Sequence, residues 1–135
     1  MNLYLSIRIA VICVVGLFTI PMAHALSLGD IKIKSALNDP LDAEIAVHST
    51  DAGEILNAKI RLASQDVHDK AGLAITQHHL RLQFKPITTG SGRFAIQVTT
   101  LRPVSEPVLE FIIEVTGGSS NLIRGYAVHL DPPNL

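Results

Sequence analysis

Cysteine and aromatic residues are scarce in this sequence. The 135 residues include one cysteine, Cys13, no tryptophan, two tyrosines and four phenylalanines. A disulfide within the chain is therefore excluded, and the fold must be stabilised by a packed core. Carbohydrate-binding β-domains usually present aromatic platforms to sugar rings, so this composition disfavours that class.

An excess of either charge is also absent. The chain has 11 Lys+Arg and 12 Asp+Glu, and Arg8 is the only one of these within the first 25 residues, so the remainder carries 10 − 12 = −2. Nucleic acids and anionic membranes select strongly basic surfaces. Neither is expected as a partner.

A hydrophobic run long enough to span a membrane is missing as well. Residues 9–20 are mostly apolar, but Pro21 interrupts them where a spanning helix of about 20 residues would continue. Ala23 and Ala25 then form the small-residue pattern that signal peptidase recognises. We expect residues 1–25 to be a secretory signal peptide, cleaved after Ala25, with the rest of the chain in the periplasm. Retention of the segment as a membrane anchor is the alternative.

The remaining residues, 26–135, alternate apolar and polar side chains in seven short runs separated by turn residues. The runs are 31–34, 41–48, 59–62, 80–85, 93–99, 109–115 and 126–130. A period of two indicates strands with one buried and one wet face, and no series of crossover helices connects them. The sequence predicts an all-β fold, an antiparallel immunoglobulin-like β-sandwich of about seven strands in one domain.

Two short helical turns are expected between the strands. Asp51 is placed to cap a helix over residues 52–56, and Ser64 to cap one that ends before Gly72. Ile112 falls on the polar face of its run. It is either a single exposed apolar residue or part of a strand that is apolar on both faces, which would be a central strand or part of a contact surface.

No set of residues in the sequence has the spacing of a catalytic or metal site. His48, His68, His78, His79 and His129 lack metal-ligand spacing and are expected at surfaces and turns. Asp42 and Glu44 are expected on a solvated strand face, and no nucleophile motif is present. We predict neither an enzyme nor a bound metal or cofactor.

Four segments of the chain resemble, in order, the sequence blocks of the FimV N-terminal domain, the periplasmic part of a family of type IV pilus assembly and cell-pole proteins. The segments are LGDIKIKSALNDPLDAEIAV (28–47), KIRLASQDVHDKAGL (59–73), LRPVSEPVLEFIIEV (101–115) and LIRGYAVHLDPP (122–133). The motif residues that the resemblance marks as structural or interaction residues are Ser35, Leu37, Asn38, Pro40, Leu41, Arg102, Pro103, Glu106, Pro107, Tyr126, Asp131 and Pro132.

The prolines of these blocks have a structural interpretation. Pro40 is expected to fix a turn after Asn38, and Leu41 to begin the next buried face. Pro103 and Pro107 are expected to mark an interrupted or edge strand, because proline cannot donate to a ladder. Backbone groups left available there would make that edge the preferred contact site.

The chain also departs from the family pattern. Members of the family continue after "LDPP" into a peptidoglycan-binding LysM module, a transmembrane helix and a cytoplasmic part, whereas this sequence ends at Leu135, so the expectation is a stand-alone domain. The family's tryptophan hairpin is replaced by residues 117–120. Gly125 and Ala127 stand where the family has a glutamate and a threonine.

The resemblance implies a non-catalytic, periplasmic protein-interaction module in type IV pilus assembly or cell-pole organisation, with envelope proteins as partners. Two alternatives remain open. One is a cell-wall module that binds peptidoglycan. The other is a periplasmic chaperone-like sandwich, which would need an exposed apolar strand such as the one containing Ile112.

Overall fold

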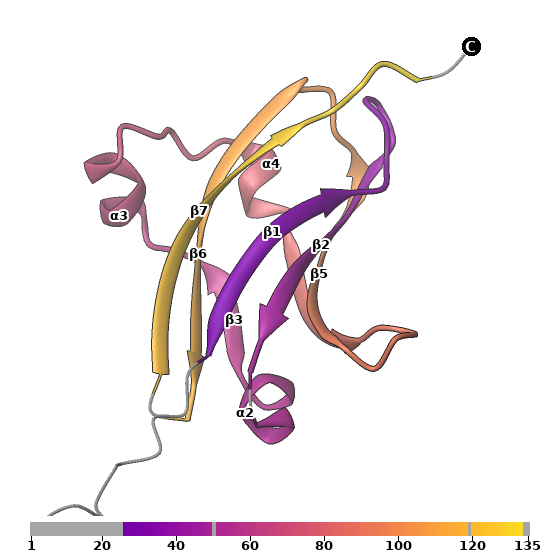
Figure 1. The fold of residues 1–135 in the computed structure, drawn as a ribbon. Helices are drawn as coiled ribbons and strands as arrows, with labels where there is room; N and C mark the ends of the chain where they lie inside the picture. The colour runs from indigo at the N-terminus through magenta and orange to yellow at the C-terminus, as the bar shows by residue number, and fades with distance from the viewer. Residues whose placement is uncertain (1–25, 50, 119, 134–135) are drawn as a thin grey trace, which may run out of the picture.

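The computed structural model describes residues 26–49, 51–118 and 120–133, and these form seven strands and three short helices (Figure 1). The strands are β1 (Ser27–Ile33), β2 (Pro40–His48), β3 (Lys59–Leu62), β4 (Gln83–Thr88), β5 (Phe94–Pro103), β6 (Val108–Gly117) and β7 (Ser120–His129). The helices are α2 (Ala52–Leu56), α3 (Gln65–Lys70) and α4 (Gln77–Leu80).

The strands build two sheets that face each other. One sheet has the order β1-β2-β5-β4 and the other the order β3-β6-β7, and every neighbouring pair is antiparallel. The alternation in β2 explains why the two sheets pack face to face. Every second residue of the strand (Leu41, Ala43, Ile45 and Val47) is buried between the sheets, and the residues between them are not. The prediction of an antiparallel, seven-stranded immunoglobulin-like sandwich is confirmed.

Aromatic rings from both sheets meet at the centre of the core. The Phe111 ring lies 6.2 Å from the Phe84 ring and 6.2 Å from the Tyr126 ring, centroid to centroid. The other buried side chains of this core are aliphatic and include Leu41, Ile45, Ile55, Ile96, Val98, Leu109, Ile113, Val115 and Val128. Burial of such side chains is the main stabilising term in a domain without disulfides.

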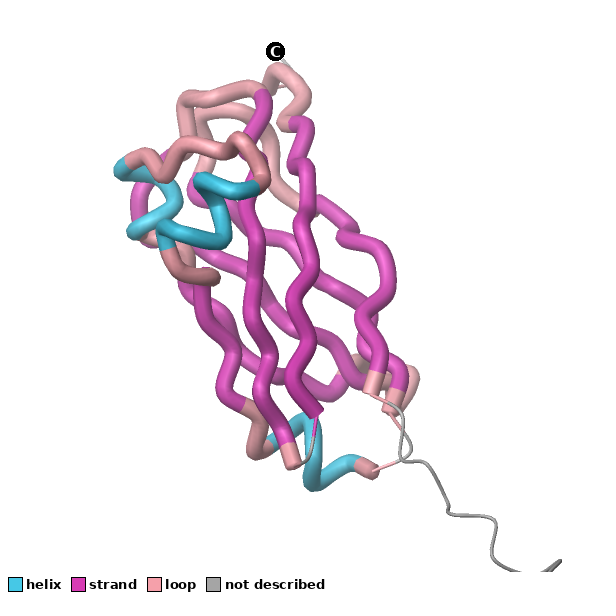
Figure 2. Tube along the Cα trace, turned by 90° about the vertical axis from the view of Figure 1, so that its left-hand side faces the viewer, coloured by secondary structure: helices cyan, strands magenta, loops and turns pink. Residues whose placement is uncertain are grey.

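Both expected helical turns are confirmed. The Asp51 carboxylate accepts a hydrogen bond from the Gly53 N–H at 2.9 Å, and the Ser64 hydroxyl accepts one from the Val67 N–H at 3.4 Å. Figure 2 shows α3 and α4 together against one side of the sandwich and α2 at the end opposite the chain's C-terminus.

A third helix, α4, was not predicted, and it corrects one strand. Leu80 was expected to open the fourth strand, but it is the last residue of α4 and is 74% exposed. The helix is stabilised because the His79 Nδ1 atom accepts a hydrogen bond from the Thr76 N–H at 2.9 Å. Without this bond the Thr76 N–H, at the start of the helix, would have no acceptor within the helix. β4 therefore starts only at Gln83.

Within the described residues, no helix is long and apolar enough to cross a membrane. The expected signal peptide, with Ala23 and Ala25 at its end, lies outside the described residues.

Candidate interaction surfaces

Three family-motif segments that are far apart in the sequence meet at one end of the sandwich. The Leu37 N–H donates to the Asp131 carbonyl at 2.8 Å, and the Asn38 N–H donates to the Val104 carbonyl at 2.9 Å. The Val104 N–H returns a bond to the Asp39 carbonyl at 3.1 Å. We call this region, made of residues 35–41, 102–107 and 130–132, the signature end; it lies at the top of Figure 1 beside the C-terminus.

The turn at the signature end is the one that the sequence predicts. The Asp39 N–H bonds back to the Ala36 carbonyl at 3.2 Å, and Asn38 has a φ of 68°, a left-handed conformation that asparagine tolerates better than most residues. Pro40 follows as the first residue of β2 and Leu41 is buried behind it.

Side chains of the motif complete this backbone network. The Ser35 hydroxyl accepts the Asp42 N–H at 2.9 Å, so it fixes the start of β2 against the residues that follow β1. The Leu41 N–H donates to the Thr100 hydroxyl at 2.8 Å, and that hydroxyl donates to the Arg102 carbonyl at 2.8 Å. Ser35 therefore has a structural role, and Thr100 joins it although the sequence did not single it out.

The expectation that Pro103 and Pro107 leave backbone groups available fails at Val104 and at the Pro107 carbonyl, which are hydrogen-bonded. Pro103 pairs with Pro40 where β5 ends, and residues 104–107 form the connection from one sheet to the other. The Val104 backbone bonds to both Asn38 and Asp39, and the Pro107 carbonyl accepts the Leu130 N–H at 2.8 Å. Both ends of the connection are therefore fixed by hydrogen bonds.

Exposed side chains at and beside the signature end provide a contact surface. Leu101 is 81% exposed near the end of β5, and it is followed by the exposed Arg102 and Pro103. Leu80 of α4 is exposed as well, three residues before β4 begins to pair with β5 at Gln83↔Thr99. We call these four residues (Leu80, Leu101, Arg102 and Pro103) the leucine surface.

Two histidines are buried, which corrects the expectation that all five lie at surfaces and turns. His68 of α3 is fully buried, and His79 of α4 is 4% exposed. Their rings are arranged edge to face with centroids 6.1 Å apart. His78 remains near the surface, with its Nε2 atom 3.8 Å from the Glu106 carboxylate.

The buried histidines bond to backbone groups of β6 that lie beyond the end of the short strand β3. β3 pairs with β6 only as far as Leu62↔Ile113, and one further bond joins the Ala63 N–H to the Ile112 carbonyl at 2.8 Å. Beyond that point the His68 Nε2 atom accepts the Ile112 N–H at 3.0 Å. The His79 Nε2 atom lies 2.5 Å from the Glu110 carbonyl and donates to it. The open edge of β6 is therefore closed by side chains instead of a strand.

Ile112 is covered by this arrangement. It is 6% exposed and lies in β6, the central strand of its sheet, so the interpretation of a central strand that is apolar on both faces is confirmed, while those of an exposed residue and of a contact surface are wrong. The chaperone-like alternative required an exposed apolar strand around Ile112, and the structure removes that support.

The spacing of Thr76 and His79, three residues apart at a helix start, was the sequence signal that could have indicated a bonded histidine.

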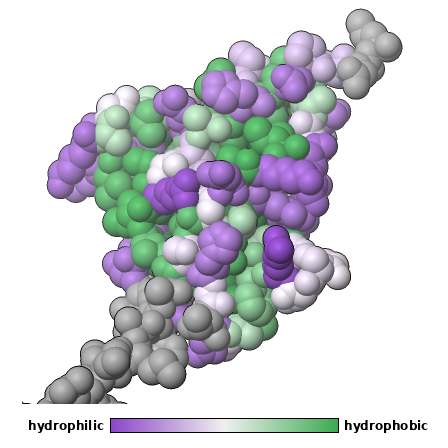
Figure 3. Space-filling model, viewed as in Figure 1, coloured by the Kyte–Doolittle hydropathy of each residue, from purple (hydrophilic) through white to green (hydrophobic). Residues whose placement is uncertain are grey.

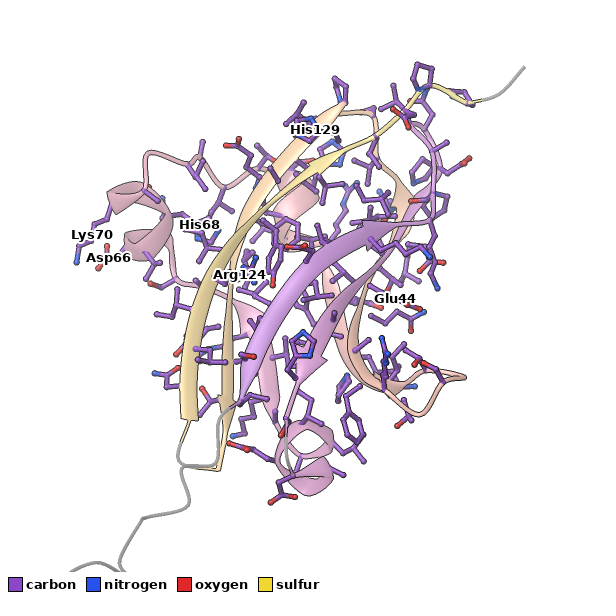
Figure 4. The ribbon with its side chains drawn as sticks, in the orientation of Figure 1. Glu44, Asp66, His68, Lys70, Arg124 and His129 are labelled. Atoms are coloured by element: carbon purple, nitrogen blue, oxygen red, sulfur yellow. The ribbon has the colours of Figure 1, made fainter. Side chains whose placement is uncertain are left out.

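Arg124 and Tyr126 connect the two sheets where β7 passes β1. The Tyr126 hydroxyl donates to the Gly29 carbonyl at 2.9 Å. The guanidinium of Arg124, the residue labelled near β7 and β1 in Figure 4, donates to the Leu28 carbonyl. The guanidinium also lies 5.0 Å from the centre of the Tyr126 ring. Burial raises the pKa of Tyr126 to about 12, and the nearby Arg124 charge only partly opposes this effect.

A concave region with a volume of about 1100 Å³ lies on the outer face of the four-stranded sheet. Its charged lining is mixed, with Asp30, Lys32, Glu44 and Arg93 around a floor that includes Ala46. Glu44 pairs with Lys34 at 2.5 Å, as expected for a solvated strand face. Across the described ranges no three His, Cys, Asp or Glu side chains converge to hold a metal ion.

Comparison with known proteins agrees with the four sequence blocks, three of which meet at the signature end. The family model described as the FimV N-terminal domain, an Ig-like domain, matches residues 26–133. The chain belongs to the FimV N-terminal domain family. It is also 41% identical over 125 residues to the motility hub protein FimV of Pseudomonas aeruginosa, in strains PAO1 and UCBPP-PA14.

This alignment covers 90% of the chain and 13% of each FimV protein, so the chain spans about an eighth of the length of these relatives. No solved structure matches the chain. The family relation explains why the motif residues lie at the signature end and along β7. Their bonds hold together an Ig-like domain that the longer FimV proteins also contain.

Proposed function

We propose that this chain is a non-catalytic protein-interaction module that acts in bacterial motility, in type IV pilus assembly or the organisation of the cell pole. The observation that carries the proposal is the 41% identity to the motility hub protein FimV across 90% of the chain. The proposal involves no metal or cofactor.

The proposed location is the periplasm, after export and cleavage behind Ala25. The family match supports this division of the chain, because it begins at residue 26, directly after the expected cleavage site. The interaction domain would then be residues 26–135.

The proposed contact site is the leucine surface, and the partner is a protein of the cell envelope. Leu80 and Leu101 are the two most exposed large hydrophobic residues in the described part of the chain. Their burial against a partner would remove apolar area from water, and Arg102 beside them offers the charged donor that interface centres favour. Arg102 and Pro103 belong to the signature end, where hydrogen bonds fix the neighbouring Val104 backbone, so little order has to be gained there on binding.

The test is affinity capture from an envelope extract of the chain's own host. The wild-type chain should recover a pilus or cell-pole protein, and the double substitution Leu80→Ser and Leu101→Ser should reduce that recovery at least tenfold. Leu56→Ser is the matched control, because Leu56 is 47% exposed in α2 at the opposite end and should leave recovery unchanged.

Equal recovery by the wild type and the double variant, with both folded, would reject the leucine surface as the contact site. Recovery of no envelope protein by the folded wild type would reject the interaction module itself. Sedimentation of the wild type with purified peptidoglycan would then support the cell-wall alternative.

A further inference from the structure

Two sheets of this kind have four edges, and three of them are protected against pairing with another strand. β4 carries Pro86, which removes a donor, and proline in a sheet is placed where its nitrogen faces away from the ladder. β1 has an irregular register between Leu28 and Ile31, and its Leu28 and Gly29 carbonyls accept bonds from β7 side chains. The edge beyond β3 is closed by the two buried histidines.

The fourth edge, along β7, has no proline and no irregular register, its contacts with β1 are made by the Arg124 and Tyr126 side chains, and its backbone is bonded only past the strand's end, where the Asp131 carbonyl accepts the Leu37 N–H. β7 pairs with β6 over ten consecutive positions, from Val108↔His129 to Gly117↔Ser120, without a register shift. The strand contains no proline and no lysine, and its single charged side chain, Arg124, is directed toward β1. Long, regular and unprotected edges of this type are templates for strand addition.

The direction of the β7 backbone groups follows from the bonds of β6. Ile112 directs its N–H and C=O toward His68 and Ala63, on the β3 side, so the odd-numbered residues of β6 direct theirs toward β7. Phe111 pairs with Tyr126, and therefore the even-numbered residues of β7 bond to β6. The backbone groups of Ile123, Gly125 and Ala127 point to the free edge.

No hydrogen bond to these three backbones is found among the described residues. Their side chains lie on the outer face, where Ile123 is 55% exposed and Gly125 and Ala127 are exposed and small. Figure 3 shows hydrophobic side chains gathered on the left flank, over β7. A Cβ atom at Gly125 would meet nothing nearer than the Ile112 Cγ1 atom at 3.7 Å, so this part of the strand is flat and open.

We propose that the β7 edge binds the β7 edge of a second copy of this chain, antiparallel and with its two-fold axis at Gly125. This register lets residues 121–129 of both strands overlap, and it places Ile123 opposite Ala127 of the second copy. Two identical edges meet in such an interface, and like charges on them would repel each other. β7 avoids this because the backbone groups at its free edge belong to uncharged residues, while Arg124 is held by the Leu28 carbonyl and by Asp30 at 3.5 Å.

A second copy is a better occupant than a charged peptide for the same reason, since the edge offers no charge to pair with. One strand pair buries a modest area, so the dimer should form and dissociate with concentration. This interface uses neither Leu80 nor Leu101 and does not depend on the proposed function.

Sedimentation of the intact chain over a hundredfold range of concentration tests the dimer. The mass should rise from one copy to two copies, and Ala127→Lys should shift the midpoint upward at least tenfold, because lysine on an edge strand opposes strand pairing and residue 127 lies opposite Ile123 of the second copy. Thr116→Lys is the matched control, because Thr116 is exposed on the same sheet face but lies on β6, one strand away from the edge. A wild type that stays monomeric throughout, or an unshifted midpoint for Ala127→Lys, would overturn the proposal.

Cysteine cross-linking in a Cys13→Ser background tests the register. Gly125→Cys should form a disulfide between two copies, because residue 125 faces itself across the axis at a separation that disulfides accept. Ile123→Cys should not, because residue 123 faces Ala127 of the second copy. The double substitution Ile123→Cys and Ala127→Cys should again cross-link. Cross-linking of Ile123→Cys alone at the rate of Gly125→Cys would contradict this pairing.

Discussion

His68 and His79 each use one ring nitrogen as a donor and the other as an acceptor. The His68 Nδ1 atom donates to the Ser64 carbonyl at 3.0 Å while its Nε2 atom accepts from Ile112. His79 has the opposite arrangement, with Nδ1 as the acceptor and Nε2 as the donor. Each ring is therefore fixed as one neutral tautomer, and each satisfies a backbone group that β3 does not reach.

Replacing His68 by leucine should destabilise the domain. The Ile112 N–H would lose its acceptor inside the protein, and an unsatisfied buried donor costs about 1–3 kcal/mol. The measurement is the free energy of unfolding in urea. His129→Leu is the control, because His129 is exposed and the substitution should change stability by less than about 0.5 kcal/mol. Equal effects of the two substitutions would contradict the bonded role of His68.

Tyr126 should make stability depend on pH only in alkaline solution. Its pKa rises from 10.0 to about 12 on folding, because burial favours the neutral phenol. This contribution is fully present below pH 10 and is lost as the pH rises through about 12, since the unfolded chain then releases the proton first. Unfolding in urea between pH 9 and pH 12 should therefore show a steeper loss of stability for the wild type than for Tyr126→Phe. Identical pH dependence of the two proteins would contradict this account.

At the scale of elements, α2 and the end of β6 are in close contact. A Cβ atom added at Gly117 would lie 2.8 Å from the Glu54 carbonyl oxygen and 3.1 Å from the Ala58 Cβ atom. The first of these is a backbone atom of a capped helix, so it has little freedom to move away. Gly117 thus lets α2 close the end of the sandwich.

Gly117→Ala should destabilise the domain by about 1–3 kcal/mol, the usual cost of an overpacked contact. Gly90→Ala is the control, because a Cβ atom there meets nothing within 4 Å and its φ is not positive. Thermal unfolding should show a lower Tm for Gly117→Ala and a Tm within a few degrees of wild type for Gly90→Ala. A lowered Tm for both would show that α2 packing is not the cause.

The strands and two of the helices could be predicted from the sequence because their signals are local. Alternation along β2 and β6 reports the two faces of each strand, and Asp51 and Ser64 are capping residues placed directly before their helices. The turn at Asn38 and Pro40 is likewise set by residues that are adjacent in the chain.

The rest depends on contacts between segments that are distant in the sequence. Leu80 continues the alternation of β4 and was assigned to a strand, but the His79–Thr76 bond places it in α4. Ile112 lies on the polar face of its strand, and only the packing of α3 beside β6 buries it. Histidine is common at surfaces, so neither His68 nor His79 carried a signal of burial without these contacts.

At the scale of the whole molecule, the signature end shows what the family motifs do. Residues 37–39, Val104 and Asp131 exchange backbone hydrogen bonds, so three blocks of sequence close one end of the sandwich together. The motif residues there that are buried or bonded, such as Leu41 and Ser35, support the fold. The motif residues that remain exposed, Arg102 and Pro103, lie in the surface that we propose for contact.

The measurement that tests the central claim most directly is deletion of this gene in its own host, with twitching motility and surface pili as the readouts. We predict that motility is lost, that the wild-type chain restores it, and that the folded Leu80→Ser and Leu101→Ser double variant restores less than a tenth of it. Full motility after deletion would contradict the proposed role in motility. Full rescue by the double variant would instead contradict the leucine surface as its site.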